Sequence, residues 1–243
     1  MTTAVPLLAL LGPALPADGQ VLPEPAVAIL AVAVAFLCGS VPFALLLGRL
    51  RGIDIRTQGS GNIGATNLGR ALGRRWGFTC FLLDALKGAI PTVLFGLWQG
   101  TWGLPLAEAP LRPTILWLAV AIAAILGHVF SPWVGFKGGK GVATGFGAMV
   151  AVWPLLTGPM LAALAAWAIL LAVTRVMSLA SVVGAMAPPA VLLVAAIRGD
   201  WPPAAAPLLA ATALVFVLVA VRHRGNFARL LAGTEDRVGD RSR

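Results

Sequence analysis

Residues 113–136 read PTILWLAVAIAAILGHVFSPWVGF, a run of 24 residues without Asp, Glu, Lys or Arg. About 20 predominantly apolar residues are enough to cross the hydrocarbon core of a bilayer as an α-helix. The chain repeats this pattern in further uncharged runs, at 25–48, 88–107, 141–174, 176–197 and 201–221. Only 11% of the 243 residues are charged and 59% are hydrophobic, whereas soluble domains carry about 25% charged residues. The sequence therefore predicts an all-α, polytopic membrane protein.

Lys and Arg predict the orientation, because short cytoplasmic loops carry an excess of both. The 34-residue run 141–174 must be divided first, since one helix of that length would be about 51 Å long and the hydrocarbon core is about 30 Å thick. Pro154 and Gly158 interrupt it. The division predicts about seven transmembrane helices, with the N-terminus outside and the C-terminus cytoplasmic. It places 15 of the 18 basic residues on the cytoplasmic side, although the first half, 141–153, is short for a crossing.

The expected domain organisation has three parts. Residues 1–25 form an extracytoplasmic tail, 26–235 form the transmembrane domain, and 236–243 form a basic C-terminal tail. The apolar segment 6–16 is short, contains three prolines and lacks a positive start, which disfavours a cleavable signal peptide.

Charge and cysteine content exclude several classes of function. The net charge of +9 comes from basic residues between apolar runs, not from a groove or an RNA-binding sheet, so no nucleic acid partner is expected. Cys38 and Cys80 lie in apolar stretches without metal-ligand spacing, so neither is expected to bind a metal. Asp84 and Lys87 lie inside the second expected helix, where ionisable groups are usually paired or functional. A structural ion pair and a catalytic pair are equally compatible with them.

The first polar motif is GSGNIGATNLGR, residues 59–70. Its glycines satisfy G-x-G-x-x-G, but a dinucleotide fingerprint needs a strand before it, and here the flanks are membrane helices. The glycines instead allow backbone N–H groups to point at one anion, and Arg70 can bind a phosphate with two parallel hydrogen bonds. The neutral donors are Ser60, Asn62, Thr66 and Asn67. The alternative is a flexible loop with an ordinary cytoplasmic arginine.

The second motif is GHVFSPWVGFKGGKGVAT, residues 127–144. It is not a Walker A sequence, because Lys140 is followed by glycine and the required earlier glycine is missing. An apolar run follows directly, so Lys137, Lys140 and the glycines between and after them open a helix, where anions bind. The alternative is anchoring by the two lysines, which would not require Gly138, Gly139 and Gly141.

Two further segments, TRVMSLAS at 174–181 and RHRGNFARLLAGTE at 222–235, carry fewer signals. Ser178 and Ser181, taken alone, fit a helix cap and a packing position. His223 and Asn226 are three residues apart and can share one helix face. The arginines around them could simply contact anionic lipid head groups.

Together, these motifs resemble those of the bacterial acyl-phosphate-dependent glycerol-3-phosphate acyltransferases, over about Ala26–Glu235. All four occur in the order of that family and on one predicted face of the membrane. The resemblance implies transfer of a fatty acyl group from acyl-phosphate to the 1-hydroxyl of sn-glycerol 3-phosphate. The products would be lysophosphatidic acid and phosphate, in the first step of phospholipid synthesis, and no metal, coenzyme A or other cofactor would be needed.

The resemblance also implies roles for individual residues. Ser60, Arg70, His223 and Asn226 would be catalytic. Substrate would be bound by Gly59, Gly61, Asn62, Thr66, Asn67, Lys137, Gly138, Gly139, Lys140, Gly141, Ser178 and Ser181. The enzyme would lie in the inner (plasma) membrane of a bacterium, with its site facing the cytoplasm. Membrane lipids and a soluble enzyme that forms acyl-phosphate would be its partners.

The chemistry expected of such a site is simple. Acyl-phosphate is a mixed anhydride with a good leaving group, and the sequence shows neither a Ser-His-Asp triad nor a reactive thiol, so direct attack by the substrate hydroxyl is expected. The base is either His223 or the phosphate of the donor, since phosphate esters have a second pKa of about 6.

Two other classes of protein fit the sequence less well. A transporter for organophosphate anions would place charge near the membrane midplane. A lipid-binding scaffold would need the basic tail but not the glycine-rich loops.

Overall fold

The computed structural model describes residues 24–199 and 201–239, and within these ranges every regular element is helical. The helices are α1 (Pro25–Ser40), α2 (Phe43–Leu50), α3 (Ala65–Leu72), α4 (Arg74–Gln99), α5 (Leu111–Val129), α6 (Val142–Val150), α7 (Thr157–Thr174), α8 (Met177–Ile197), α9 (Ala205–Arg222) and α10 (Arg224–Leu231). Short 3₁₀ turns occupy Ile55–Thr57, Leu106–Glu108 and Pro132–Val134. Most of the expected N-terminal tail and the last four residues of the C-terminal tail lie outside the described residues.

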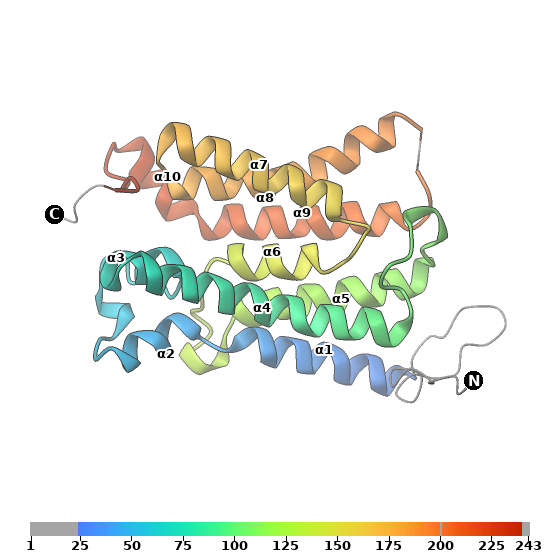
Figure 1. Cartoon of the computed structure of the whole chain (residues 1–243), viewed down its shortest axis with the longest axis horizontal. Coiled ribbons are helices and arrows are strands. Elements are labelled where there is room, and N and C mark those ends of the chain that lie inside the picture. The colour runs from blue at the N-terminus through green and yellow to red at the C-terminus, as the bar shows by residue number, and fades with distance from the viewer. Residues whose placement is uncertain (1–23, 200, 240–243) are drawn as a thin grey trace, which may run out of the picture.

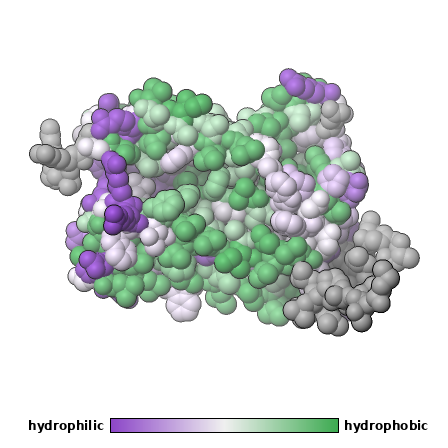
Figure 2. Space-filling model, in the orientation of Figure 1, coloured by the Kyte–Doolittle hydropathy of each residue, from purple (hydrophilic) through white to green (hydrophobic). Residues whose placement is uncertain are grey.

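Six of the described helical segments are long and apolar enough to cross a membrane. They cover 25–50, 74–99, 111–134, 157–174, 177–197 and 205–222. The long helices run side by side, and α2, α3 and α10 gather at one end of the bundle (Figure 1). In the view of Figure 2, hydrophobic residues cover most of the side of the bundle, and most of the strongly hydrophilic residues lie at that same end. The predicted all-α membrane fold is confirmed, whereas the count of about seven crossings and the orientation of the termini stay predictions.

The run 141–174 is divided around Pro154, as predicted, because α6 ends at Val150 and α7 begins at Thr157. The nine residues of α6 give a helix of only about 14 Å. The chain nevertheless passes from one end of the bundle to the other. Lys140 contacts the α9–α10 junction, and the carbonyl of Trp153 accepts a hydrogen bond from Gly103, in the loop at the opposite end. Such a short helix is tolerable in the middle of the bundle because α6 packs between other helices rather than against lipid.

Small residues bring the central helices into backbone contact. A Cβ added to Gly39 of α1 would overlap the carbonyl of Ala124 in α5, and one added to Gly147 of α6 would overlap the carbonyl of Ala85 in α4. Such close crossings suit a lipid environment, where association depends on packing rather than on a hydrophobic driving force.

The first crossing breaks between α1 and α2, at Val41 and Pro42. Proline lacks an N–H and disfavours helical geometry in the residue before it, so the last carbonyl groups of α1 need other partners. The carbonyl of Ser40 accepts from the Ser131 hydroxyl at 2.6 Å, and that of Val41 accepts from the Lys87 ammonium at 2.6 Å. The break directs the chain into the first glycine-rich loop.

Candidate active site

A cleft of about 230 Å³ opens at the end of the bundle that carries α3 and α10. Three segments far apart in the sequence line it: the first glycine-rich loop, the loop before α6, and the α9–α10 junction. The lining residues are Ser60, Gly61, Asn62, Ile63, Lys137, Gly138, Lys140, Arg222, Gly225, Asn226 and Arg229. Within the described part of the chain this lining includes four cationic side chains and no carboxylate. The cleft is therefore suited to anions.

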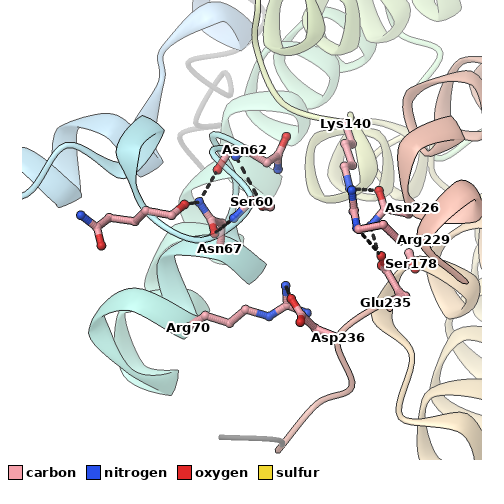
Figure 3. A network of polar contacts seen from close by, with 11 residues as sticks. Ser60, Asn62, Asn67, Arg70, Lys140, Ser178, Asn226, Arg229, Glu235 and Asp236 are labelled. Carbon is pink, nitrogen blue, oxygen red and sulfur yellow. Dashed lines mark hydrogen bonds and ion pairs between the residues drawn. The ribbon is translucent and has the colours of Figure 1, made fainter. Parts of the chain in front are cut away.

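Asn67 of α3 determines the shape of the first loop. Its side chain is buried, and its amide donates to the carbonyls of Ile55, Gln58 and Asn62 at 3.2, 3.0 and 3.1 Å. Its Oδ1 atom accepts from the Ser60 N–H at 3.2 Å. Figure 3 shows Asn67 enclosed by the loop, so it organises the loop and is not offered to the cleft.

The glycines of this loop meet a backbone requirement. Gly59 and Gly61 have φ values of 50° and 67°, a region that favours glycine. A Cβ on Gly59 would also lie 2.7 Å from the Oδ1 atom of Asn67. Gly59 thus shapes the loop, while Ser60, Gly61 and Asn62 face the cleft.

In the loop before α6, the backbone of Gly138 and Gly139 does not have the anion-binding arrangement that the sequence predicted. The N–H groups of Gly138 and Gly139 do not point at a free anion but donate to the carbonyls of Val129 and His128, at 3.1 and 3.2 Å. The physical reason is that the last carbonyl groups of α5 have no partner within their own helix. A Cβ on Gly138 would overlap the His128 carbonyl, and one on Gly139 would overlap the His128 ring. Both glycines are therefore explained by packing.

Arg222 fixes the other side of the same loop. Its Nη2 atom donates to the carbonyl of Gly138 at 2.7 Å, and its Nε atom donates to the carbonyl of Gly139 at 3.2 Å. Gly141 has a φ of 83° and leads the chain into α6. The loop is thus clamped from both sides, and Lys137 and Lys140 project from it to line the cleft.

A chain of hydrogen bonds connects Lys140 to Glu235 (Figure 3). The Lys140 ammonium donates to Asn226 Oδ1 at 2.5 Å, and Asn226 Nδ2 donates to Glu235 Oε1 at 2.5 Å. The same carboxylate accepts from the Ser178 hydroxyl at 2.7 Å and from Arg229 Nε at 2.9 Å. Asn226 thus has its oxygen directed at the lysine by the carboxylate behind it. Glu235 is part of the motif at 222–235, but the sequence alone predicted no role for it.

The ionisation of this group follows from its surroundings. Burial, reinforced by the charges of neighbouring arginines, lowers the pKa of Lys140 to about 8, although Glu235 acts in the opposite direction. Burial alone would raise the pKa of Glu235, but hydrogen bonds from Asn226 and Ser178 and the charge of Arg229 bring it below its usual range. Near neutral pH, Lys140 is mostly cationic and Glu235 is ionised.

His223 is buried and does not line the cleft. Its Nδ1 atom lies 2.8 Å from the carbonyl of Val219. A carbonyl can only accept, so Nδ1 carries the proton and Nε2 holds the lone pair. Burial, together with the charge of Lys140, lowers the pKa of His223 to about 4. The histidine is neutral at physiological pH and is a weak base.

The remaining predicted residues do not line the cleft. Arg70 extends from α3 to the C-terminal segment and forms an ion pair with Asp236 at 2.8 Å (Figure 3). Thr66 is exposed on α3. The Ser181 hydroxyl donates to the carbonyl of Met177 in its own helix at 2.8 Å.

Four cleft residues were not predicted from the sequence: Ile63, Arg222, Gly225 and Arg229. For Arg222 and Arg229 the signal was the basic spacing of the motif at 222–235, whose arginines were equally compatible with lipid contact. Among residues 24–199 and 201–239, no cluster of His, Cys, Asp and Glu side chains could hold a metal ion.

Comparisons with known proteins agree with this geometry. A family model described as glycerol-3-phosphate acyltransferase matches residues 29–233. A glycerol-3-phosphate acyltransferase from Trichlorobacter lovleyi is 44% identical over 206 residues, which cover 85% of this chain and 95% of the relative. One from Sinorhizobium fredii is 37% identical and covers 88% of this chain and 93% of the relative.

Two solved structures of PlsY (YgiH), an integral membrane glycerol 3-phosphate acyltransferase, share the fold. The glycerol 3-phosphate form has a TM-score of 0.73 and 35% identity, and covers 88% of this chain and 96% of that chain. The lysophosphatidic acid form has a TM-score of 0.71 and 34% identity, with the same coverage. The relatives come from bacteria, and this chain is a bacterial membrane protein. It belongs to the family of integral membrane glycerol-3-phosphate acyltransferases.

Proposed function

We propose that the cleft binds glycerol 3-phosphate and acyl-phosphate together and transfers the acyl group to the 1-hydroxyl of glycerol 3-phosphate. The products are lysophosphatidic acid and inorganic phosphate. The observation that carries the proposal is the cleft of about 230 Å³, lined by Lys137, Lys140, Arg222 and Arg229 without a carboxylate among its described lining residues. The PlsY structures in glycerol 3-phosphate and lysophosphatidic acid forms support the choice of substrate and product.

The number of cations suits two phosphorylated substrates. Each phosphate monoester carries a charge of about −1.5 to −2 at pH 7. Two unit charges 4 Å apart repel by about 4 kcal/mol at an effective dielectric constant of about 20. Four cations offset this repulsion, so that the cleft aligns two reactants that would otherwise avoid each other.

The proposed reaction is a direct acyl transfer. The 1-hydroxyl oxygen attacks the carbonyl carbon of acyl-phosphate, a new ester C–O bond forms, and the bond from that carbon to the phosphate oxygen breaks. The phosphate leaves with the electron pair and takes up the hydroxyl proton, so the charges and atoms balance. His223 is the less suitable base because it is buried, lies outside the cleft lining and has a pKa of about 4.

The proposed location is the inner membrane, with the cleft facing the cytoplasm. This orientation follows from the basic residues at the cleft end of the bundle. A soluble enzyme that forms acyl-phosphate would deliver the donor to that face. Residues 26–235 would form one acyltransferase domain.

The test is an assay of the purified full-length protein in lipid, with acyl-phosphate and acyl-coenzyme A compared as donors. We expect lysophosphatidic acid only with acyl-phosphate, together with one phosphate released per ester formed. Lys140→Met tests the cleft itself and should raise the KM for glycerol 3-phosphate. Equal use of acyl-coenzyme A would refute the donor assignment, and vesicles that accumulate glycerol 3-phosphate without ester formation would indicate a transporter.

A further inference from the structure

A buried charged cluster lies under the cleft and has no part in the proposed chemistry. Asp84 and Lys87, both in α4, form an ion pair of 2.7 Å, with side-chain exposures of only 2% and 5%. The Nδ1 atom of His128, also buried, lies 3.8 Å from Asp84 Oδ1. Charges at this depth are costly and tend to be retained for a function. Replacing a buried ion pair by apolar residues is often neutral or stabilising, so stability alone does not explain this one.

The cluster connects to the first crossing through Lys87. Its ammonium donates to the carbonyl of Val41 at 2.6 Å, which is one of the groups freed by the break before Pro42. The same ammonium lies 5.6 Å from the centre of the ring of Phe43, which is the first residue of α2. Lys87 therefore fixes the point from which α2 leads to the first glycine-rich loop.

The cluster connects to the second loop through His128. The Gly139 N–H donates to the His128 carbonyl, and the imidazole packs so closely on Gly139 that no Cβ would fit between them. Asp84, Lys87, His128, Gly138 and Gly139 also surround one small cavity of about 10 Å³. This volume is near the smallest that holds one water molecule, so the cluster and the loop are in close mutual contact.

We propose that Asp84 and Lys87 are positioning residues: their buried ion pair, next to His128, holds the 138–140 backbone where Lys140 meets glycerol 3-phosphate. The ion pair would stabilise the loop from the α4 and α5 side, in addition to the hydrogen bonds that Arg222 donates to the loop from α9. The inference rests on the proposed function, since it assigns glycerol 3-phosphate to the loop at 137–141. A displacement of about 1 Å at such a site is enough to reduce turnover by about 100-fold.

Binding of labelled glycerol 3-phosphate to the purified full-length protein, measured by equilibrium dialysis without acyl donor, tests this proposal. The main variant is Asp84→Asn with Lys87→Met, because either substitution alone would leave one buried charge unpaired. We expect a folded protein whose Kd for glycerol 3-phosphate is raised at least about tenfold. His128→Asn leaves the ion pair intact and should raise the Kd similarly. Gln99→Met, at a buried polar position at the far end of α4, is the matched control and should keep the wild-type Kd.

The outcomes separate this inference from the proposed function. If the wild-type protein does not bind glycerol 3-phosphate, the proposed function fails and the inference fails with it. If the wild-type protein binds it and either folded variant has the same Kd, the inference alone is overturned. If neither variant folds, the cluster serves the bundle rather than the loop, and the inference is likewise overturned.

Discussion

Substitution of Asn67 by alanine should strongly reduce the activity of the enzyme without removing any group that lines the cleft. The buried amide donates to three backbone carbonyls and accepts from one N–H. Each such bond contributes about 0.5–1.5 kcal/mol net, and the amide has two hydrogens and one accepting oxygen, so the ordered form of the loop should lose about 1.5–4.5 kcal/mol. Since 1.4 kcal/mol corresponds to a factor of ten, even the lower limit predicts a fall of about tenfold in the equilibrium constant for the ordered loop.

The assay is the initial rate of lysophosphatidic acid formation by the purified protein in lipid, at saturating acyl-phosphate. Limited trypsin digestion gives an independent measure, because a loosened loop should be cleaved faster after Arg51 and Arg56. Gln58→Ala is the matched control: it removes an amide from the same loop, but that side chain donates only one long bond of 3.4 Å. An Asn67→Ala enzyme within threefold of the wild-type rate would refute the reasoning, since the loop geometry would then not depend on this amide.

Three further predictions concern the charged groups around the cleft. Lys140 has a lowered pKa of about 8, so its cation is present below pH 8 and is lost as the pH rises through that value. The KM for glycerol 3-phosphate should therefore rise above pH 8 in steady-state assays, and Lys140→Arg should abolish that rise; an unchanged pH profile would contradict the assignment. If Arg70 binds a substrate phosphate, as the first motif predicts, Arg70→Ala should abolish transfer, whereas Asp236→Ala should change the rate by less than about fivefold, because an ion pair this exposed contributes about 0–1 kcal/mol. Equal effects of the two substitutions would show that Arg70 matters only through Asp236. His223→Gln should keep at least about a third of the turnover number if the donor phosphate accepts the proton, and a loss of 100-fold, as expected for a general base, would assign that role to His223.

Much of the fold could be predicted from the sequence because the bilayer responds to local composition. The uncharged runs at 113–136 and 176–197 coincide closely with helices, since any apolar segment of that length must satisfy its backbone internally. The division at Pro154 could be predicted for the same reason. The break before Pro42 was not predicted, because its freed carbonyls are satisfied by Lys87 and Ser131, which lie far along the chain.

The sequence predicted which segments form the candidate site, but it predicted less well which individual residues line the cleft. Ser60, Asn62, Lys137, Lys140 and Asn226 do line one cleft, as their motifs indicated. Other predicted residues stabilise the loops of the cleft: Asn67 shapes the first loop, and Gly138 and Gly139 pack on α5. A glycine that permits close packing and a glycine that binds an anion look the same in a sequence, so only the neighbouring atoms distinguish them.

The sequence by itself determined the membrane class, the approximate crossings and the segments that meet at the cleft, because these depend on hydropathy and charge along a single stretch of chain. Only the tertiary structure decided which atoms face the substrate and which support them. Glu235 became the partner of Asn226 and Ser178, and Asp84 became the neighbour of His128, through contacts between separate helices. The strength of a hydrogen bond or an ion pair depends on distance and burial, and neither quantity is set before the helices pack.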